Sequence, residues 1–428
     1  MEAASDDLFP VEFKRIQSDS ITDDAFLLDE KPEVTEYGAI EEPGPEALHY
    51  FQEADVKKIF LILMTLVVLA GATPLFAQKT YKIGVIPKFI AEDYFIACER
   101  GFRQAEKEIG NLKVDWIGDP MSQTSAANQK NYIQGFIDKR YDAILVSALD
   151  PESYADTLKA ARAKGIKIIT WDADVNVAAR DYFVNQVISE QIAIQLLKGL
   201  AGDLTGYSAS NKATIALVST TNDSPNQNAW LKAIIDEYKS KASAEYKHIN
   251  LMASADEIVY AGNDQGTADE KIKSLLSANA SIKGIIALSS NTVPAVSSAR
   301  DQLGIKDAIK IVGVSVPESS RKDMQAGKMS GVVLWQPFDL GYLTLYVAKA
   351  VLDGKNPSGK TFKSPLSGTT MAPSFIDGKT SVKYPAAGHQ ILANNVVILG
   401  DPIVWNLKNI DAFRGYPNPD SGMAQFKK

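Results

Sequence analysis

The 428-residue chain has little of what several classes of functional site require. It contains a single cysteine, Cys98, which excludes an intramolecular disulfide and a metal site built from several cysteines. Its three histidines, His49, His248 and His389, stand in unrelated contexts and form no catalytic or metal-binding pattern. We therefore expect no metal ion and no cofactor.

Motifs for nucleophilic and nucleotide chemistry are also missing. The sequence has no G-x-S-x-G elbow, no P-loop and no G-x-G-x-x-G. Asp172 and Asp174 could act as an acid and a base, but a shared ligand or a loop turn explains the pair as well. No cluster of Lys and Arg and no recognition-helix pattern point to nucleic acid as a partner. We predict a protein that is not an enzyme.

Acidic residues are concentrated at the start of the chain. Residues 1–55 hold 16 acidic and three basic residues, whereas the rest of the chain is close to neutral. This acidic segment, interrupted by prolines, does not suit the basic helix-turn-helix of a transcription repressor. We predict that residues 1–55 are not part of the mature protein.

A hydrophobic stretch follows at residues 56–77, VKKIFLILMTLVVLAGATPLFA. The basic pair Lys57 and Lys58, the apolar centre and the small-residue end have the organisation of a signal peptide cleaved before Gln78. The stretch predicts export to the periplasm and favours a translation start at Val56. The alternative is an uncleaved membrane anchor, although the run is shorter than the ~20 apolar residues that cross a bilayer comfortably.

Short apolar strands then alternate with amphipathic helices. Strands with near-continuous β-branched residues, set between helices, are typical of buried parallel strands. This succession implies parallel sheets with right-handed crossovers, and the number of strands favours two similar lobes. We expect the strands at residues 82–86, 114–117, 143–147, 166–171, 214–219, 249–252, 284–288, 309–314 and 331–335.

Local signals refine this pattern. Asp150 and Pro151 predict the N-cap and first residue of a helix, and Gly165 its end. Residues 354–394, which are rich in Gly, Pro, Ser and Thr, predict an irregular or short-stranded appendage, and residues 396–399 an edge strand.

Polar and aromatic side chains follow several strands at their carboxyl ends, where open α/β sheets bind ligands. Amides, hydroxyls, carboxylates and aromatic rings together suit a polyhydroxylated ligand, whose hydroxyls need donors and acceptors and whose C–H faces stack on rings. Trp171 is expected to pack in the core, and Trp230 either to stack on the ligand or to pack at a hinge. The predicted ligand-binding residues are Lys88, Tyr94, Phe95, Asp172, Asn226, Gln227, Ser289, Ser290, Ser315 and Trp335.

Several segments carry a resemblance to a known family. They are KIGVIPKF followed by DYF, then YDAILVSALDP, KIITWDADV, PNQNAW, and IVGVSVP followed by VVLWQPFDLGYLTLYVAKAVLDG. In this order and spacing, residues 81–413 resemble the type I periplasmic solute-binding proteins of ABC importers, in the branch of the ribose-, rhamnose- and autoinducer-2-binding proteins.

The resemblance implies a fold of two Rossmann-like lobes with parallel sheets, joined by three crossovers at a hinge. The N-terminal lobe would comprise residues 78–185 and 336–354, and the C-terminal lobe residues 186–335. Residues 355–428 would return across the hinge. The resemblance further implies a monomer that captures a sugar-like ligand and presents it to a membrane permease.

The resemblance also bears on the ligand. Autoinducer-2-binding relatives have the equivalents of Lys88 and Asp172, but an Asp-Gln pair where this chain has Asn226 and Gln227. They also have Pro-x-Ala where this chain has Leu-Ser-Ser. These departures favour an ordinary sugar, and the segment LWQPFDLGYLT favours a rhamnose-like one. Ala173, in place of an arginine, argues against a ribose-type pocket.

The sequence leaves two alternative functions open. One is an autoinducer-2 receptor of the same fold. The other is a membrane-anchored sugar sensor, which requires that residues 56–77 are not cleaved.

Overall fold

The computed structural model describes residues 79–305, 309–369 and 383–413, together with residues 58 and 415. All elements described below belong to the unit Ala77–Lys428. The predicted acidic leader and, apart from Lys58, the predicted signal peptide lie outside the described residues. Within the described part, no helix has the length and apolar character needed to cross a membrane.

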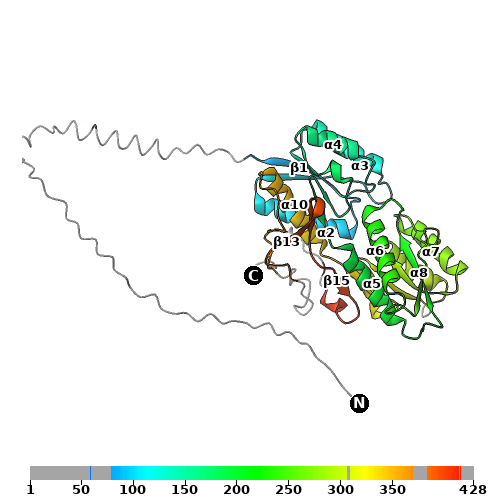
Figure 1. Ribbon diagram of the computed structural model, residues 1–428. Helices are drawn as coiled ribbons and strands as arrows, with labels where there is room; N and C mark the ends of the chain where they lie inside the picture. Colours follow the sequence, from blue (N-terminus) through cyan, green and yellow to red (C-terminus); the bar gives the residue numbers. More distant parts are fainter. Residues whose placement is uncertain (1–57, 59–78, 306–308, 370–382, 414, 416–428) are drawn as a thin grey trace, which may run out of the picture. The chain divides into compact units, whose positions relative to one another are not determined.

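The first lobe is a sheet covered by helices on both faces (Figure 1). Helices α2 (Asp93–Ile109) and α10 (Pro337–Leu352) pack together on one face, and α3 (Ala126–Asp138) and α4 (Ala155–Ala163) cover the other. The strands, in spatial order, are β12 (Thr361–Phe362), β13 (His389–Leu392), β14 (Val396–Ile398), β5 (Tyr182–Asn185), β4 (Lys167–Trp171), β3 (Ala143–Val146), β1 (Tyr81–Ile86) and β2 (Leu112–Trp116).

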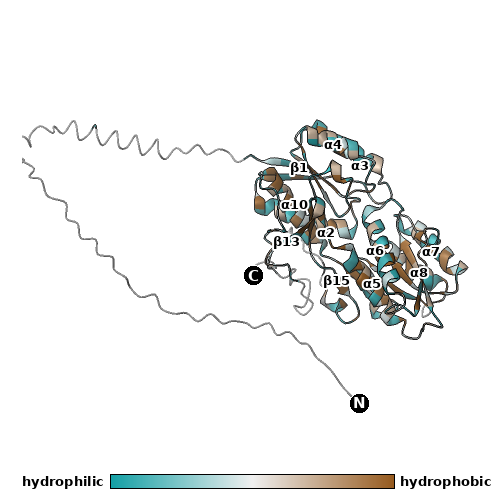
Figure 2. Cartoon of the chain, in the orientation of Figure 1, coloured by the Kyte–Doolittle hydropathy of each residue, from teal (hydrophilic) through white to brown (hydrophobic). Residues whose placement is uncertain are grey.

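Burial on both faces explains the apolar composition of these strands. In β3, Ala143 and Leu145 join one hydrophobic cluster while Ile144 and Val146 join the other. Successive side chains of a strand point to opposite faces, so a strand between two helical layers needs apolar residues at every position. Figure 2 shows such brown, hydrophobic strands between helices that mix teal and brown positions.

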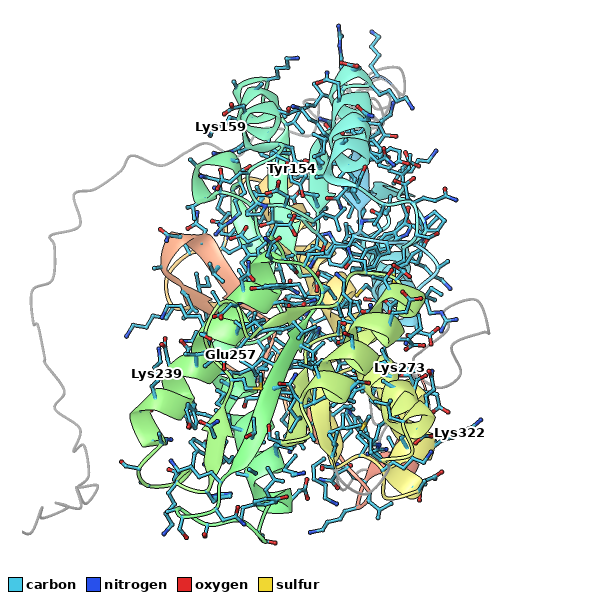
Figure 3. All side chains as sticks on the ribbon, turned by 90° about the vertical axis from the view of Figure 1, so that its right-hand side faces the viewer. Tyr154, Lys159, Lys239, Glu257, Lys273 and Lys322 are labelled. Atoms are coloured by element: carbon cyan, nitrogen blue, oxygen red, sulfur yellow. The ribbon has the colours of Figure 1, made fainter. Side chains whose placement is uncertain are left out.

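The second lobe repeats this arrangement. Its helices are α5 (Ser189–Asp203), α6 (Pro225–Lys241), α7 (Gln265–Ala278), α8 (Thr292–Gln302) and α9 (Pro317–Gln325). Its strands, in spatial order, are β15 (Ile403–Trp405), β11 (Gly331–Leu334), β10 (Lys310–Val314), β9 (Ile282–Ala287), β6 (Ala213–Ser219) and β7 (Ile249–Leu251), and β8 (Val259–Tyr260) also pairs with β6. Figure 3 shows Lys239, Lys273 and Lys322 projecting outward from helices of this lobe.

In the described residues the chain passes between the sheets three times. It crosses from β5 to α5, from β11 to α10, and from β14 to β15. The predicted fold class, two α/β lobes joined by three crossovers, is therefore confirmed. Both sheets are nevertheless mixed, because the C-terminal strands β12, β13 and β15 pair antiparallel with their neighbours.

Two local predictions are wrong. The helix predicted to open at Asp150 starts later, at Ala155, because the Asp150 carboxylate accepts a hydrogen bond from the backbone N–H of Glu152 at 3.0 Å and so closes a turn. Residues 396–398 do not form an edge strand: β14 lies between β5 and β13, and the short strands of the appendage occupy the edge.

Helices α2 and α10 approach each other closely enough for their backbones to touch. A Cβ atom on Gly101 of α2 would lie 1.8 Å from the carbonyl oxygen of Phe338, and one on Gly341 of α10 would lie 2.1 Å from that of Cys98. Only glycine fits at such a contact. Cys98 is fully buried beside it.

Candidate functional site

A cavity of about 680 Å³, including the space at its mouth, lies between the lobes. Side chains that follow strands of both sheets surround it, so it occupies the position where parallel α/β sheets bind ligands. The lining residues are Lys88, Phe89, Glu92, Tyr94, Phe95, Met121, Leu149, Asp172, Thr220, Thr221, Ser224, Asn226, Gln227, Trp230, Asn263, Leu288, Ser289, Ser290, Asn291, Val314, Leu334 and Trp335.

The structure brings all the predicted site residues to this cavity except Ser315. Strand β10 ends at Val314, whose side chain lines the cavity, and the next side chain points away. Ser315 is fully buried, with its hydroxyl 3.1 Å from that of Ser319.

Asp172 lies directly after β4 in an unusual backbone conformation. Its φ angle is +61°, in the left-handed region that aspartate tolerates better than most side chains but that still costs energy. The carboxylate is buried and accepts hydrogen bonds from Tyr94 Oη (2.8 Å) and Ser147 Oγ (2.7 Å). A buried carboxylate needs such partners to stay charged. The turn thus holds the carboxylate of Asp172 at the cavity.

A chain of hydrogen bonds connects Asp172 to the second crossover. Trp335 follows β11, and its indole Nε1 donates to Tyr94 Oη at 2.9 Å, while Tyr94 donates in turn to Asp172. Burial raises the pKa of Tyr94 well above its ordinary value, and the negative charge of Asp172 adds to the effect. Tyr94 therefore remains a neutral hydroxyl, able to donate to the carboxylate.

Lys88 is the cation of the site. Its ammonium Nζ lies 3.9 Å from Asp172 Oδ2 in the first lobe, and it donates to Asn226 Oδ1 in the second lobe at 2.9 Å. Burial lowers the pKa of Lys88, while the charges of Asp172 and Asp223 oppose that shift. Lys88 Nζ also donates to Ser224 Oγ of the second lobe at 3.4 Å, so Lys88 links the two lobes and keeps one N–H group for Asp172 or a ligand.

Two amides from the second lobe stand at the start of α6. The helix begins at Pro225, which places Asn226 and Gln227 in its first turn. Gln227 Oε1 accepts from Ser219 Oγ at 2.6 Å and from the backbone N–H of Thr220 at 2.9 Å. These bonds fix the amide, whose N–H groups are left to donate toward the cavity.

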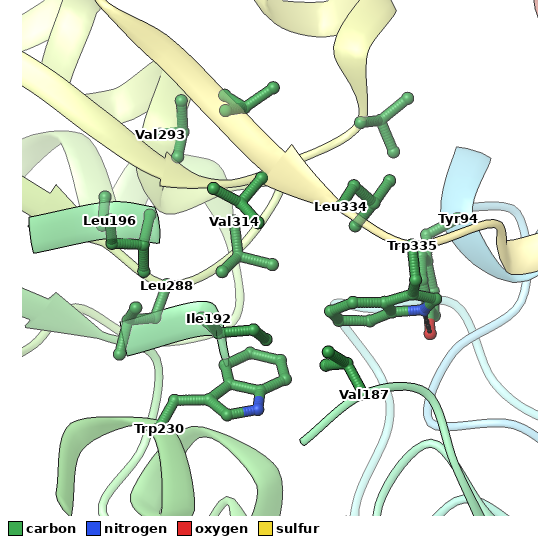
Figure 4. Packing of buried hydrophobic residues seen from close by; sticks show 14 of the residues in the cluster. Tyr94, Val187, Ile192, Leu196, Trp230, Leu288, Val293, Val314, Leu334 and Trp335 are labelled. Atoms are coloured by element: carbon green, nitrogen blue, oxygen red, sulfur yellow. Dashed lines mark hydrogen bonds between the residues drawn. The ribbon is translucent and has the colours of Figure 1, made fainter. Parts of the chain in front are cut away.

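Aromatic rings form the remaining wall. Trp230 and Trp335 lie with their ring centroids 5.6 Å apart, and Trp335 also meets Tyr94 edge-on at 5.9 Å. Figure 4 shows the two indoles beside Leu288, Val314 and Leu334. Rings in this arrangement provide apolar faces on which the C–H groups of a sugar can stack.

Trp171 and Asp174, on either side of Asp172, do not line the cavity. Trp171 is fully buried and packs against Phe95 and Phe102 rather than lining the cavity, as the core prediction states. Asp174 forms an ion pair with Arg180 at 2.7 Å and is not part of the lining.

Sequence reasoning missed part of the lining. Thr220, Thr221 and Ser224 directly follow β6, so the rule that found Asp172 could have found them. Met121 and Leu149 lie in the loops that follow β2 and β3, but their apolar side chains do not mark a ligand site in the sequence. In the described part of the chain, no group of three or more His, Cys, Asp or Glu is placed to hold a metal ion.

The chain is similar in sequence to periplasmic binding proteins. Residues 83–356 match the family model described as "Periplasmic binding protein domain". A D-allose-binding periplasmic protein of Escherichia coli is 24% identical over 319 residues, which cover 69% of this chain and 90% of that protein.

Solved structures are similar over both lobes. A solute-binding protein of an ABC transporter from Clostridium phytofermentas, with bound L-rhamnose, has a TM-score of 0.67 and 21% identity and covers 78% of this chain and 98% of its own. LsrB from Clostridium saccharobutylicum, in complex with AI-2, has a TM-score of 0.64 and 25% identity. The match covers 78% of this chain and 99% of the LsrB chain.

Proposed function

Because the chain belongs to the periplasmic binding protein family, we propose that it is the exported sugar-binding component of an ABC importer. It is a binding protein and not an enzyme. The observation that carries the proposal is the cavity between the lobes, in which the charged pair Lys88 and Asp172 faces the aromatic rings of Trp230 and Trp335. Such a site offers hydroxyl groups both donors and acceptors, and offers a sugar ring an apolar face.

The ligand that this site favours is a monosaccharide, with a rhamnose-like sugar first. Support comes from the apolar side chains Leu288, Val314 and Leu334, which join the two tryptophans on one side of the cavity and suit an alkyl group. A relative of this fold holds L-rhamnose. Another holds AI-2, so an autoinducer-2 receptor is the second candidate.

The ligand-contacting residues in this proposal are those that the sequence predicts and the cavity contains. Ser315 is left out, and Trp230 is added because it lines the cavity beside Trp335. The set is Lys88, Tyr94, Phe95, Asp172, Asn226, Gln227, Trp230, Ser289, Ser290 and Trp335.

Sugar binding would close the two lobes around the ligand. In this proposal residues 78–185 and 336–354 move as one body and residues 186–335 as the other, with residues 355–428 returning across the hinge. Contacts from both lobes to one ligand stabilise the closed form, because the ligand binds that form more tightly than the open one. The closed form would then be presented by a monomer to a membrane permease.

Export through cleavage of residues 56–77 is part of the same proposal. N-terminal sequencing of the protein recovered from the periplasm should find Gln78 first. Recovery in the membrane with residues 56–77 retained would favour the anchored sensor instead.

A thermal-shift panel tests the sugar assignment. A ligand that binds the folded chain at 100 times its Kd adds about 2.7 kcal/mol of stability, which corresponds to a rise in Tm of roughly 3 to 10 °C. We expect such a rise with at least one of L-rhamnose, D-allose, D-ribose and D-xylose. A rise with autoinducer-2 alone would favour the second candidate, and no rise with any of these compounds would contradict both.

A further inference from the structure

Gln129 of α3 is almost fully buried and uses all of its hydrogen-bonding capacity within the first lobe. Its Nε2 donates to the carbonyl oxygens of Pro87 and Ser147, each at 2.9 Å. Its Oε1 accepts from the backbone N–H of Leu149 at 3.0 Å and from Tyr154 Oη at 2.8 Å. An amide has two N–H donors and two acceptor lone pairs, so Gln129 has none left for a ligand. It is not among the residues that line the cavity.

The groups that Gln129 holds lie at the carboxyl ends of neighbouring strands, beside the charged residues of the cavity. Pro87 follows β1 and directly precedes Lys88. Ser147 follows β3, and its hydroxyl donates to Asp172 Oδ2 at 2.7 Å. One buried side chain therefore connects the segment that carries the cation to the residue that holds the carboxylate.

The start of α3 also holds the backbone of the cation itself. Thr124 Oγ1 donates to the carbonyl oxygen of Lys88 at 2.8 Å. The next residue, Ser125, caps the helix by accepting from the backbone N–H of Asn128 at 3.1 Å, which fixes this end of α3. The consecutive carbonyl groups of Pro87 and Lys88 are thus both bonded to side chains of one anchored element.

The relative position of these strand ends determines the geometry of the charged pair. Lys88 follows β1 and Asp172 follows β4, and β3 lies between these two strands in the sheet. The distance of 3.9 Å from Lys88 Nζ to Asp172 Oδ2 therefore depends on how the three strand ends are fixed to one another. Groups that are held in place before binding give higher affinity, because a ligand does not have to order them.

We propose that Gln129, together with Thr124, positions the binding site: the two side chains fix the strand ends that carry Lys88 and hold Asp172, so that both charged groups are in place before a ligand enters. This role depends on the sugar-binding function proposed above. It makes ligand affinity sensitive to a residue that has no hydrogen-bonding group free for the ligand and lies outside the cavity lining.

Gln129→Met tests the proposal, because methionine has a similar length but cannot bond the strand ends. The full-length chain is titrated calorimetrically with L-rhamnose, D-allose, D-ribose and D-xylose, well below the Tm of each variant. The sugar that binds the wild type should bind Gln129→Met roughly tenfold more weakly, still with one site per chain. Gln134→Met, at an exposed position of the same helix, is the control and should bind as the wild type does.

A second control separates positioning from stability. Tyr384→Phe removes a buried hydrogen bond to Asp339, and neither residue lines the cavity. This variant should have a lower Tm and an unchanged sugar affinity, which is the pattern that a purely structural role of Gln129 would also give. Gln129→Met should instead lose both stability and affinity.

The contrary outcomes separate two claims. If Gln129→Met melts at a lower temperature but binds the sugar as tightly as the wild type, the positioning role is overturned and sugar binding stands. Equal losses of affinity in Gln129→Met and Tyr384→Phe overturn it as well. If the wild-type chain binds none of the sugars, the proposed function falls, and the role of Gln129 with it.

Thr124→Val takes the place of Gln129→Met if that variant does not fold. Valine has nearly the shape of threonine and lacks only the hydroxyl that holds the carbonyl group of Lys88. We expect roughly threefold weaker sugar binding with a small change in Tm. Unchanged affinity in Thr124→Val would overturn the proposal.

Discussion

Lys88 of the first lobe donates a hydrogen bond of 2.9 Å to Asn226 of the second lobe across the cleft. The same ammonium lies 3.9 Å from Asp172, the carboxylate held at the end of β4. One cation therefore joins the charged centre of one lobe to the first turn of α6 in the other. A ligand bound among these groups would contact both lobes at their point of connection.

Removing the Lys88 ammonium should weaken both ligand binding and the contact between the lobes. Lys88→Met retains the apolar stem but leaves Asp172 buried without its cation. We expect ligand affinity to fall by roughly 10-fold or more, since a hydrogen bond to a charged group contributes about 1.5 to 3 kcal/mol. Calorimetry and small-angle scattering measure the two effects. Lys113→Met, at an exposed lysine of β2, is the control and should change neither.

Two substitutions of Asp172 separate the effect of its charge on ligand affinity from the effect of its backbone conformation on stability. Asp172→Asn keeps a side chain that tolerates a φ of +61° but removes the charge, so affinity should fall about 10- to 100-fold with a small change in Tm. Asp172→Ala should lose binding and, in addition, about 1 to 2 kcal/mol of stability, because alanine is disfavoured in this conformation. Equal Tm values for the two variants would contradict the assignment of backbone strain.

The close contact between α2 and α10 predicts a large effect of one methyl group. Gly101→Ala would place a Cβ 1.8 Å from the carbonyl oxygen of Phe338, and the helices would have to separate. We expect a loss of about 3 kcal/mol or more of unfolding free energy in a denaturant titration. Gly135→Ala, in α3, meets no atom within 4 Å and should be neutral or stabilising by up to about 1 kcal/mol. Similar effects of the two substitutions would contradict the packing.

Much of this architecture could be predicted from the sequence, because continuous apolar runs between amphipathic helices specify buried parallel strands. Asp172 could be placed for the same reason, since it directly follows such a run. The left-handed backbone of Asp172 could not, because aspartate is also common in ordinary turns. The bonds that hold its carboxylate come from residues 78 and 25 positions away, which no local pattern reveals.

The structure also differs from the sequence-based predictions where the position of a side chain depends on a shift of one residue along the chain or on the path of a loop. Ser315 was expected in the cavity, but side chains alternate along a strand, and Val314 holds the inward position. Asp150 is a misleading signal for a helix start, because an aspartate side chain accepts the same kind of backbone N–H hydrogen bond at a helix N-cap and in a turn. Met121 and Leu149 reach the cavity only through the paths of their loops.

Asp339 predicts how stability depends on pH. Its carboxylate is buried at the start of α10, accepts a hydrogen bond from Tyr384 Oη at 2.7 Å, and has its pKa raised by burial to about 6. A pKa raised on folding means that the folded chain binds the proton more tightly than the unfolded chain. This contribution favours folding below about pH 4 and is lost as the pH rises to about 6.

Asp339→Asn removes the ionisation and should flatten that part of the stability profile. At pH 7.5 the variant should be more stable by up to about 3 kcal/mol, since one pKa unit corresponds to 1.36 kcal/mol. Asp156→Asn, at an exposed position of α4, is the control and should retain the slope. Denaturant titrations between pH 4 and 8 measure it, and a slope unchanged in Asp339→Asn would contradict the prediction.

The central claim is that one sugar molecule binds between the two lobes through Asp172. Titration calorimetry of the full-length chain with L-rhamnose, D-allose, D-ribose and D-xylose tests it most directly, with Asp172→Asn measured in parallel. The account predicts saturable binding of at least one of these sugars with one site per chain, weakened about 10- to 100-fold in the variant. No binding of any of these sugars, or equal binding by the variant, would contradict it.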